Sequence, residues 1–384
     1  MSSAPQLSRH RRQPRRGSSD IFRDHAHAIL GGCVAVISAM ILGTAVLGGV
    51  HGGADAYPQG HAEAESKPGM VSRTSDVVRG SLPVGHPIED HVINGSLSPG
   101  SAALVEFSVN PAEDATGVEA SGHQRNRQAY VVVGRNYDPN QPMPLVFAVG
   151  GWKDNPENLM SYARIDQSGM GDDAIVVYPR GLKDAWEGAP YSESKQGEDV
   201  AFVKRMVTDL SASLNVDLAR VFGLGMSNGG GMVTTVACRA PELFAGFVSI
   251  SGAYYHPTMA GCDPAERTSG EFFVPALLIH GDEDRRTQYA GGLLHEAPYY
   301  GVRDVAKQLA QLNKCDDTPL ERDLTGEEYG PEDKIKPDTV TELRYESCVA
   351  PVTHWQVHGK GHKWYYSPDT AGSAWNFFKA VSKL

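Results

Sequence analysis

The amino-acid sequence predicts one large α/β domain, built on a mostly parallel sheet with helices on both faces. From about residue 102 to the end of the chain, short apolar runs alternate with stretches of amphipathic helical character. Strands and helices in alternation are typical of such a sheet. The length of 384 residues and the hydrophobic content of 41% leave room for a sizeable core and for terminal extensions.

Seven segments have the length and apolar character of buried strands. They cover residues 129–133, 145–149, 174–178, 220–224, 246–250, 276–280 and 353–357. Between two of them, residues 199–214 repeat apolar side chains at i, i+3 and i+4, which predicts an amphipathic helix. Ligands of open α/β sheets bind beyond the carboxyl ends of the strands, so we expect the chemistry in the loops that follow them.

The first 56 residues are typical of a targeting segment. Six arginines, all within the first 23 residues, precede an uncharged run over residues 28–50. Positive charge before an apolar stretch marks a cytoplasmic flank, so the rest of the chain is expected to be exported to the cell envelope or the extracellular space. The Ala-Asp-Ala triplet at 54–56 fits signal-peptide cleavage, and the apolar run is also about long enough for a retained membrane anchor. Both outcomes stay open.

Residues 57–101 are predicted to be a flexible linker, which places the α/β domain at residues 102–384. The linker is rich in Gly, Pro, Ser, His and charge and has no sustained apolar periodicity. The chain carries a net charge of −11, and residues 1–56 carry +3, so the part from Tyr57 onward carries −14. Such a surface disfavours nucleic acid and anionic membranes as partners.

Four cysteines belong to the part expected to be exported, namely Cys238, Cys262, Cys315 and Cys348, while Cys33 lies in the targeting segment. An even number of cysteines in an oxidising compartment favours two disulfides. Four cysteines allow three connectivities, and composition does not choose between them.

The pentapeptide Gly-Met-Ser-Asn-Gly at 225–229 follows the strand predicted over 220–224 and precedes an apolar, helix-like stretch. G-x-S-x-G between a strand and a helix is typical of the nucleophile elbow of α/β-hydrolases. There, small flanking residues permit a strained turn that exposes the serine hydroxyl. The pattern predicts Ser227 as a nucleophile and the α/β-hydrolase fold.

A serine hydroxyl needs an adjacent base, and in this fold an acid and then a histidine follow the serine along the chain. The strand predicted over 276–280 runs into a turn that contains Asp282 and Asp284. The strand predicted over 353–357 runs into a loop that ends at His362. These loops share the sheet edge at which Ser227 is expected, so Asp284 and His362 are predicted to complete a Ser-His-Asp triad.

The histidines His354, His358 and His362 recur at every fourth residue, which on a helix would form one metal-binding face. Gly359 and Gly361 disfavour a helix there, and the preceding residues are predicted to form a strand. No metal site is expected.

Negative charge that develops on a substrate oxygen needs backbone N–H donors. The residue after the nucleophile, Asn228, supplies one. The loop after the strand over 145–149 contains Gly150, Gly151 and Trp152, and its glycines allow close approach of the backbone to a ligand. We expect the Trp152 N–H as the second donor and Gly151 beside the substrate.

Six segments resemble the secreted esterases that are grouped with polyhydroxybutyrate depolymerases and feruloyl esterases. They are PLVFAVGGW, AIVVYPRGL, GEDVAFVKRMV, RVFGLGMSNGGGM, LLIHGDEDRRTQYAGG and HWQVHGKGHKW, and the resemblance runs from about Gly122 to Leu384. It implies the acid at the second acidic position of the turn before Tyr-x-Gly-Gly, which selects Asp284 over Asp282. It also implies the base at the histidine of Gly-His-x-Trp, which is His362.

The resemblance further implies disulfides between Cys238 and Cys262 and between Cys315 and Cys348. The sequence departs from the family in one place. It has Gly150-Gly151 where the family usually has His-Gly. An oxyanion donor is a backbone N–H, so the loss of that imidazole should leave the hole usable and affect substrate preference more.

Together these features predict an exported serine ester hydrolase that forms an acyl-enzyme on Ser227 and uses no metal or organic cofactor. The expected partner is an uncharged ester, either a feruloyl or other carbohydrate ester or a hydroxyalkanoate polyester. A membrane partner is expected only through the possible amino-terminal anchor. The aromatic residues expected around the pocket are Trp152, Trp186, Tyr254, Tyr255 and Trp364.

Two alternatives to hydrolysis stay open from sequence. An acyltransferase would use the same triad and pass the acyl group to a hydroxyl other than water. A non-catalytic surface or carbohydrate-binding protein could retain the hydrolase fold, although the intact Ser, Asp and His argue against it.

Overall fold

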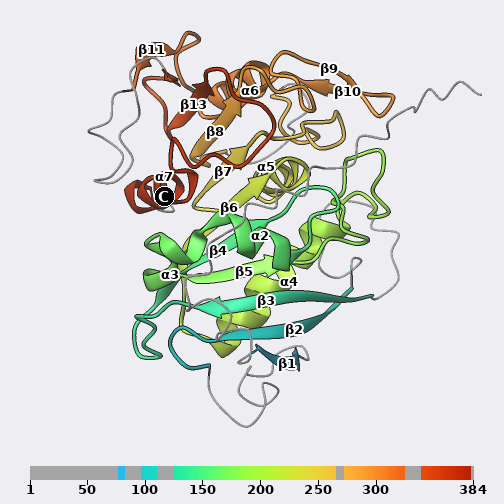
Figure 1. The fold of residues 1–384 in the computed structure, drawn as a ribbon, viewed down its shortest axis with the longest axis vertical. Helices are drawn as coiled ribbons and strands as arrows, with labels where there is room; N and C mark the ends of the chain where they lie inside the picture. The colour runs from blue at the N-terminus through green and yellow to red at the C-terminus, as the bar shows by residue number, and fades with distance from the viewer. Residues whose placement is uncertain (1–76, 83–96, 111–124, 265–271, 325–338, 382–384) are drawn as a thin grey trace, which may run out of the picture. The chain divides into compact units, whose positions relative to one another are not determined.

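The computed structural model describes residues 77–82, 97–110, 125–264, 272–324 and 339–381, the first range as backbone alone (Figure 1). All of them belong to the unit Glu65–Leu384. The expected targeting segment, residues 1–56, lies outside the described residues. Within the ranges given, no helix is long and apolar enough to cross a membrane.

An 11-stranded sheet forms the centre of this unit, with strand order β1-β2-β3-β5-β4-β6-β7-β8-β13-β12-β11 (Figure 1). Its strands are β1 (Val77–Leu82), β2 (Ala102–Val109), β3 (Arg125–Val133), β4 (Met143–Val149), β5 (Ile175–Pro179), β6 (Val216–Met226), β7 (Gly246–Ile250), β8 (Ala276–Gly281), β11 (Leu320–Asp323), β12 (Val340–Arg344) and β13 (Val352–Val357). A separate hairpin pairs β9 (Gly291–Leu294) with β10 (Ala297–Tyr300).

The helices are α2 (Pro156–Ala163), α3 (Met170–Asp173), α4 (Glu198–Ser213), α5 (Asn228–Arg239), α6 (Val302–Leu312) and α7 (Thr370–Ala380), with a short 3-10 helix, η3, at Ile165–Gln167. Six neighbouring strands, from β5 through β4, β6, β7 and β8 to β13, run parallel to one another. Strands β3 and β12 join this block antiparallel at its two sides. The α/β-hydrolase fold expected from sequence is confirmed.

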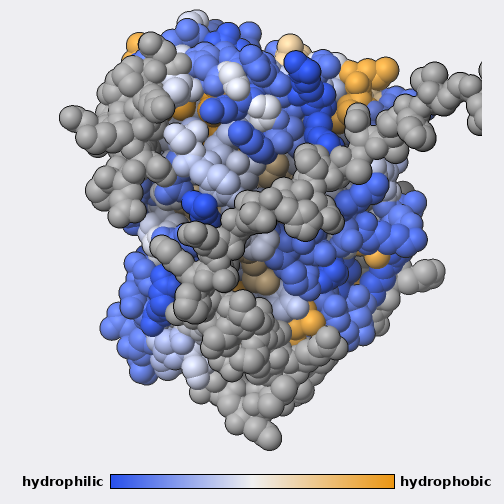
Figure 2. Space-filling view, in the orientation of Figure 1, coloured by the Kyte–Doolittle hydropathy of each residue, from blue (hydrophilic) through white to orange (hydrophobic). Residues whose placement is uncertain are grey.

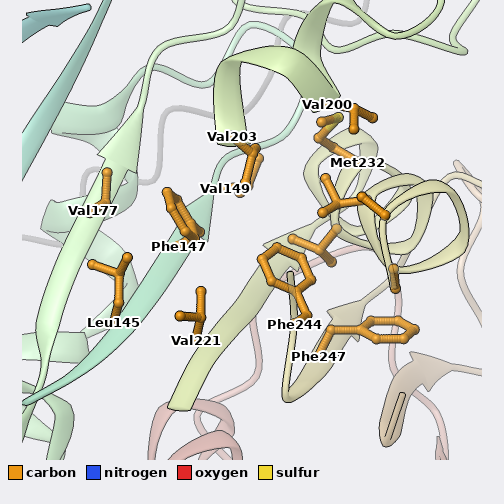
Figure 3. Packing of buried hydrophobic residues seen from close by; sticks show 14 of the residues in the cluster. Leu145, Phe147, Val149, Val177, Val200, Val203, Val221, Met232, Phe244 and Phe247 are labelled. Carbon is orange, nitrogen blue, oxygen red and sulfur yellow. The ribbon is translucent and has the colours of Figure 1, made fainter. Parts of the chain in front are cut away.

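Strand β4 is an example of a central strand with a continuous apolar sequence. All seven of its residues are buried. Leu145, Phe147 and Val149 pack into the core layer shared with α4, α5 and α6, while Val146 and Ala148 pack into the layer shared with α2, α3 and α7. Both faces of a parallel sheet are covered by helices, so neither face of the strand can carry polar side chains. Figure 3 shows the first layer, where Phe147 and Val221 of the sheet face the side of α4 and α5.

The seven strands expected from sequence are all present, as β3 to β8 and β13. The sequence did not predict the other strands, which are β1 and β11 at the two edges of the sheet, their neighbours β2 and β12, and the hairpin strands β9 and β10. For example, β11 has no buried residue and β12 mixes buried with half-buried positions, so neither strand is a continuous apolar run. Strand β1 falls inside residues 57–101, where a linker is expected, and pairs with β2 through its backbone. The domain boundaries themselves stay a prediction.

Two disulfides link the carboxyl-terminal ends of α5 and α6 to loops elsewhere in the chain. Cys238, near the end of α5, forms a disulfide with Cys262, and Cys315, just after α6, forms one with Cys348.

The face of the molecule seen in Figure 2 is mostly hydrophilic and carries only small, separate hydrophobic patches. Scattered apolar residues of this kind are ordinary for a protein surface.

Candidate active site

Ser227 stands alone at the junction between β6 and α5. Its φ of 56° and ψ of −121° lie outside the regions that L residues ordinarily adopt. The turn requires glycine on both sides. A Cβ at Gly225 would collide with the backbone of Gly229, and a Cβ at Gly229 would collide with the carbonyls of Val149 and Gly150. The G-x-S-x-G pattern therefore has a steric cause, and the hydroxyl of Ser227 is half-exposed at the carboxyl end of β6.

His362 lies beside this hydroxyl on the loop after β13. Its Nε2 is 2.9 Å from Ser227 Oγ, and its Nδ1 is 2.8 Å from Asp284 Oδ2. A carboxylate can only accept, so Nδ1 carries the proton and Nε2 is left to accept from the serine. Three side chains that are 57 and 78 residues apart along the chain thus form one hydrogen-bonded line. This is the arrangement that general-base activation of a serine requires.

Asp284 is buried, and its carboxylate is held from several sides. Oδ1 accepts from the backbone N–H groups of Arg286 and Thr287 at 2.8 and 3.0 Å. Oδ2 accepts from the Thr287 hydroxyl at 3.0 Å, and His280 Nε2 lies 3.3 Å away. Burial raises the pKa of Asp284, but hydrogen bonds from His280 and His362 outweigh it and hold the pKa well below its usual range. Asp284 is therefore ionised wherever a neutral histidine could act as a base.

The neighbouring acid, Asp282, has a different histidine. Its Oδ2 is 2.8 Å from His358 Nδ1, and its Oδ1 accepts from the Gly359 N–H at 2.8 Å. The other nitrogen of His358 is 2.8 Å from the hydroxyl of Thr341 on β12. This pair leads away from Ser227, and only Asp284 belongs to the line that ends on the serine.

The two segments that contain the expected oxyanion donors, Asn228 and Trp152, both pass next to Ser227. Asn228 is the first residue of α5, so its N–H has no partner within the helix. On the other side, a Cβ at Gly151 would lie 3.7 Å from Ser227 Oγ, so the loop after β4 passes directly beside the nucleophile. Gly151 has no side chain to fill the space beside the nucleophile, and the Trp152 N–H stays the predicted second donor.

The aromatic residues expected around the pocket separate into two groups. Trp186 and Trp364 are only 2% and 5% exposed, and Tyr254 and Tyr255 are buried as well, so none of these rings offers a face to a substrate. They serve the core instead, because apolar rings at loop ends are readily covered by the loops around them. Only Trp152 is half-exposed.

Trp152 belongs to an aromatic cluster that the sequence did not predict. Its ring stacks on Tyr191 with centroids 4.2 Å apart, and His295, in the turn between β9 and β10, meets both rings edge-on at 5.1 and 5.0 Å. Tyr255 lies beneath, with its hydroxyl 3.1 Å from His295 Nδ1. Burial, together with the charge of Lys153, lowers the pKa of His295, which favours the neutral ring.

Thr287 and His280 are two further site residues that sequence reasoning missed. Both contact the Asp284 carboxylate, and the Thr287 hydroxyl also lies 3.1 Å from His362 Nδ1. The only sequence feature that could have indicated His280 is that it is a polar residue within an otherwise apolar strand. The contact between His280 and Asp284 depends on the conformation of the turn after β8, which the local sequence does not predict.

The three histidines at every fourth residue do not converge. His354 lies in β13 with its Nε2 2.7 Å from the Tyr289 hydroxyl, His358 pairs with Asp282, and His362 faces Ser227. Within the described part of the chain, no group of three or more His, Cys, Asp or Glu side chains could hold a metal ion.

Comparison with known proteins finds similar esterases. The family model described as esterase PHB depolymerase matches residues 130–291, which include the elbow and the Asp284 turn. Over these residues the chain is similar to esterases of the PHB depolymerase type. It is a carboxylic ester hydrolase, as the resemblance of its motifs implied.

Two fungal proteins are among the relatives of this chain. One, from Aspergillus niger, is named probable feruloyl esterase C and is 28% identical over 240 residues, covering 61% of this chain and 76% of its own. Feruloyl esterase C of Emericella nidulans is 27% identical over 212 residues, covering 53% of this chain and 68% of its own. Among solved structures, acetyl xylan esterase from Aspergillus awamori covers 65% of this chain and 94% of its own, at 16% identity and a TM-score of 0.49.

Proposed function

We propose that this chain is an exported serine esterase that cleaves uncharged esters through an acyl-enzyme on Ser227. The hydrogen-bonded line from Ser227 through His362 to Asp284 is the observation that carries the proposal, with 2.9 and 2.8 Å between the paired atoms. The strained φ of Ser227 supports it, since a non-glycine residue at such a position is typical of functional sites.

In the proposed reaction, Ser227 Oγ attacks the ester carbonyl carbon while its proton passes to His362 Nε2. The carbonyl oxygen becomes negative and accepts hydrogen bonds from the N–H groups of Trp152 and Asn228. His362 then returns the proton to the leaving alcohol as the carbon–oxygen bond breaks. A water molecule repeats the sequence on the acyl-enzyme and releases the acid, with His362 again as base and then acid.

The proposed substrate is an extracellular ester with an aromatic or apolar acyl part, such as a feruloyl ester of a polysaccharide or a hydroxyalkanoate oligomer. Two relatives carry the name feruloyl esterase, which supports an aromatic acid. The half-exposed cluster of Trp152 and Tyr191 beside Gly151 supports it too, because aromatic faces and edges contact aromatic ligands favourably. The net charge of −14 from Tyr57 onward disfavours anionic esters.

Export is supported by the two disulfides, since such bonds persist in oxidising compartments. The predicted targeting segment at residues 1–56 is the other argument for export. Amino-terminal sequencing of the mature protein separates its two forms. A chain that begins just after Ala56 indicates a cleaved signal peptide, and an intact terminus in the membrane fraction indicates an anchor.

The central test is Ser227→Ala, with hydrolysis of p-nitrophenyl butyrate and labelling by a fluorophosphonate as readouts. We expect both to be lost while the thermal unfolding midpoint stays near that of the wild type, since the elbow accepts a small residue. A variant that retains wild-type turnover would remove Ser227 from the mechanism. A wild type that neither turns over esters nor reacts with the probe would favour the non-catalytic alternative.

Specificity constants for methyl ferulate, acetylated xylan, p-nitrophenyl acetate and a soluble hydroxybutyrate oligomer test the substrate class. Preference for ferulate or the oligomer supports the proposal, and efficient turnover of carboxylate-bearing or phosphorylated esters alone contradicts it. Product analysis in the presence of added sugar or lipid alcohols distinguishes hydrolysis from acyl transfer.

A further inference from the structure

We propose that Trp186 is a positioning residue of the oxyanion hole. Its side chain and its backbone tie together the two segments that supply the expected donors, the loop after β4 and the first turn of α5. The inference rests on the serine esterase function proposed above. It replaces the substrate contact that the sequence suggested for Trp186.

The first tie is made by the indole ring. Trp186 is 2% exposed, and its Nε1–H donates to the carbonyl oxygen of Gly150 at 2.9 Å. That carbonyl belongs to the peptide unit that precedes Gly151, one unit before the Trp152 N–H. Two consecutive glycines leave the backbone free to rotate, so an external hydrogen bond is needed to fix the direction of the donor that follows.

Two backbone hydrogen bonds hold the other end of the same loop. The Lys153 N–H donates to the carbonyl of Asp184 at 2.8 Å, and the Asp154 N–H donates to the carbonyl of Gly151 at 3.2 Å. The loop after β4 is therefore attached at both ends, and at each end one partner comes from residues 184–186. Trp186 holds the end that lies nearest to Ser227.

The second tie runs from the backbone of Trp186 to the nucleophile helix. Its N–H donates to Asn228 Oδ1 at 2.8 Å, and its carbonyl lies 3.5 Å from Asn228 Nδ2. Asn228 is 1% exposed and carries the other expected oxyanion donor on its own N–H. Trp186 therefore fixes the distance between the two donors as well as the direction of one of them.

A buried ionic network holds Trp186 in turn. The next residue, Glu187, donates its N–H to Asp199 Oδ2 at 2.7 Å and accepts the Asp199 N–H on Oε2 at 2.7 Å. Arg239 pairs with Glu187 at 3.1 Å, and Arg127 pairs with Asp199 at 2.9 Å, with all four side chains buried. A satisfied buried polar network of this kind rigidifies the loop that it supports.

Rigidity at this place has a catalytic consequence. Oxyanion donors lower the barrier because they already point to where the charge develops and need no reorganisation. A displacement of about 1 Å in a reacting geometry can cost roughly a hundredfold in rate. Loss of the Trp186 indole N–H should thus weaken stabilisation of the transition state and leave binding of the ground-state ester intact.

The test compares Trp186→Phe with Trp355→Phe in the full-length protein. Trp355 of β13 is also 2% exposed, and its indole N–H donates to Glu342 Oε2 at 3.1 Å, so the control loses an equivalent buried hydrogen bond away from Ser227. For Trp186→Phe we expect kcat/KM to fall about 10- to 100-fold through kcat, with KM unchanged and by the same factor for p-nitrophenyl acetate and methyl ferulate. Affinity for an aryl boronic acid, which forms a tetrahedral adduct on the serine, should fall in parallel.

Three results would overturn the inference. They are a kcat/KM for Trp186→Phe within about twofold of that for Trp355→Phe, a rise in KM confined to the aromatic ester, and an unchanged affinity for the boronic acid. Should Trp186→Phe not fold, benzothienylalanine at position 186 keeps the bicyclic ring and replaces N–H by sulfur, and the same expectations apply. An inactive wild type that fails to react with a fluorophosphonate would instead refute the proposed function itself.

Discussion

Replacing Asp284 by asparagine is the sharpest test of the triad, because either orientation of the amide places its NH2 group against a hydrogen-bond donor. The carboxylate accepts from two backbone N–H groups on Oδ1 and faces His362 Nδ1 with Oδ2. In Asp284→Asn, the NH2 group must face either those two N–H donors or His362. The backbone donors are fixed in the turn, so the amide is expected to turn its NH2 group toward the imidazole.

The consequence is the wrong tautomer of His362. Facing an N–H donor, Nδ1 becomes the acceptor and the proton moves to Nε2, which can then no longer accept from Ser227. The equivalent change in a serine protease costs about ten-thousand-fold in kcat, or about 5.5 kcal/mol of transition-state stabilisation. We expect a loss of this order for p-nitrophenyl butyrate, with a KM close to that of the wild type.

Asp282→Asn is the matched control, since it lies in the same turn and also contacts a histidine through Nδ1. Asp282 is more exposed, and its partner His358 continues to Thr341 rather than to Ser227. We expect its kcat to stay within about tenfold of the wild type, because no reacting atom depends on it. A larger loss in Asp282→Asn, or equal losses in both variants with unchanged unfolding midpoints, would refute the assignment of Asp284.

Two further predictions concern stability. Burial lowers the pKa of His354 to about 3, so stability is fully present above the ordinary histidine pKa of 6.5 and is lost as pH falls from 6.5 toward 3. Relative to His354→Gln, the unfolding free energy of the wild type should fall by about 1.4 kcal/mol per pH unit in that window, measured by urea denaturation, and parallel curves would contradict it. Removing the disulfide with Cys238→Ala and Cys262→Ala should cost about 3 kcal/mol for a sequence separation of 24 residues, and a crossed pairing in non-reduced peptide maps would refute this connectivity.

The central strands could be predicted because their surroundings impose a local pattern. Strand β7, for example, has the bounds expected from sequence, Gly246–Ile250, since all five residues are buried between two helical layers. The edge strands could not be predicted in the same way. Strand β11 is held by pairing with β12 and has mostly exposed side chains, so its sequence LERD carries no apolar signal.

The elbow is the part of the site that the sequence by itself determined. Gly225 and Gly229 are required by backbone contacts within the same five-residue turn and with the adjacent strand end, so a local motif is sufficient to locate Ser227. The choice between Asp282 and Asp284 could be made from the family pattern but not from spacing. Both acids follow the same strand and are two residues apart.

Only the tertiary structure decided which histidine meets which acid and which groups Trp186 contacts. Strands β8 and β13 pair in parallel with Gly281 opposite Val357, so the next residues, Asp282 and His358, meet, and Asp284 is left for His362. That register depends on strands more than 70 residues apart. The hydrogen bonds of Trp186 likewise span 36 and 42 residues. A buried tryptophan in a loop looks the same in sequence whether it contacts substrate or holds a carbonyl, because the difference lies in which distant backbone the fold brings to its N–H.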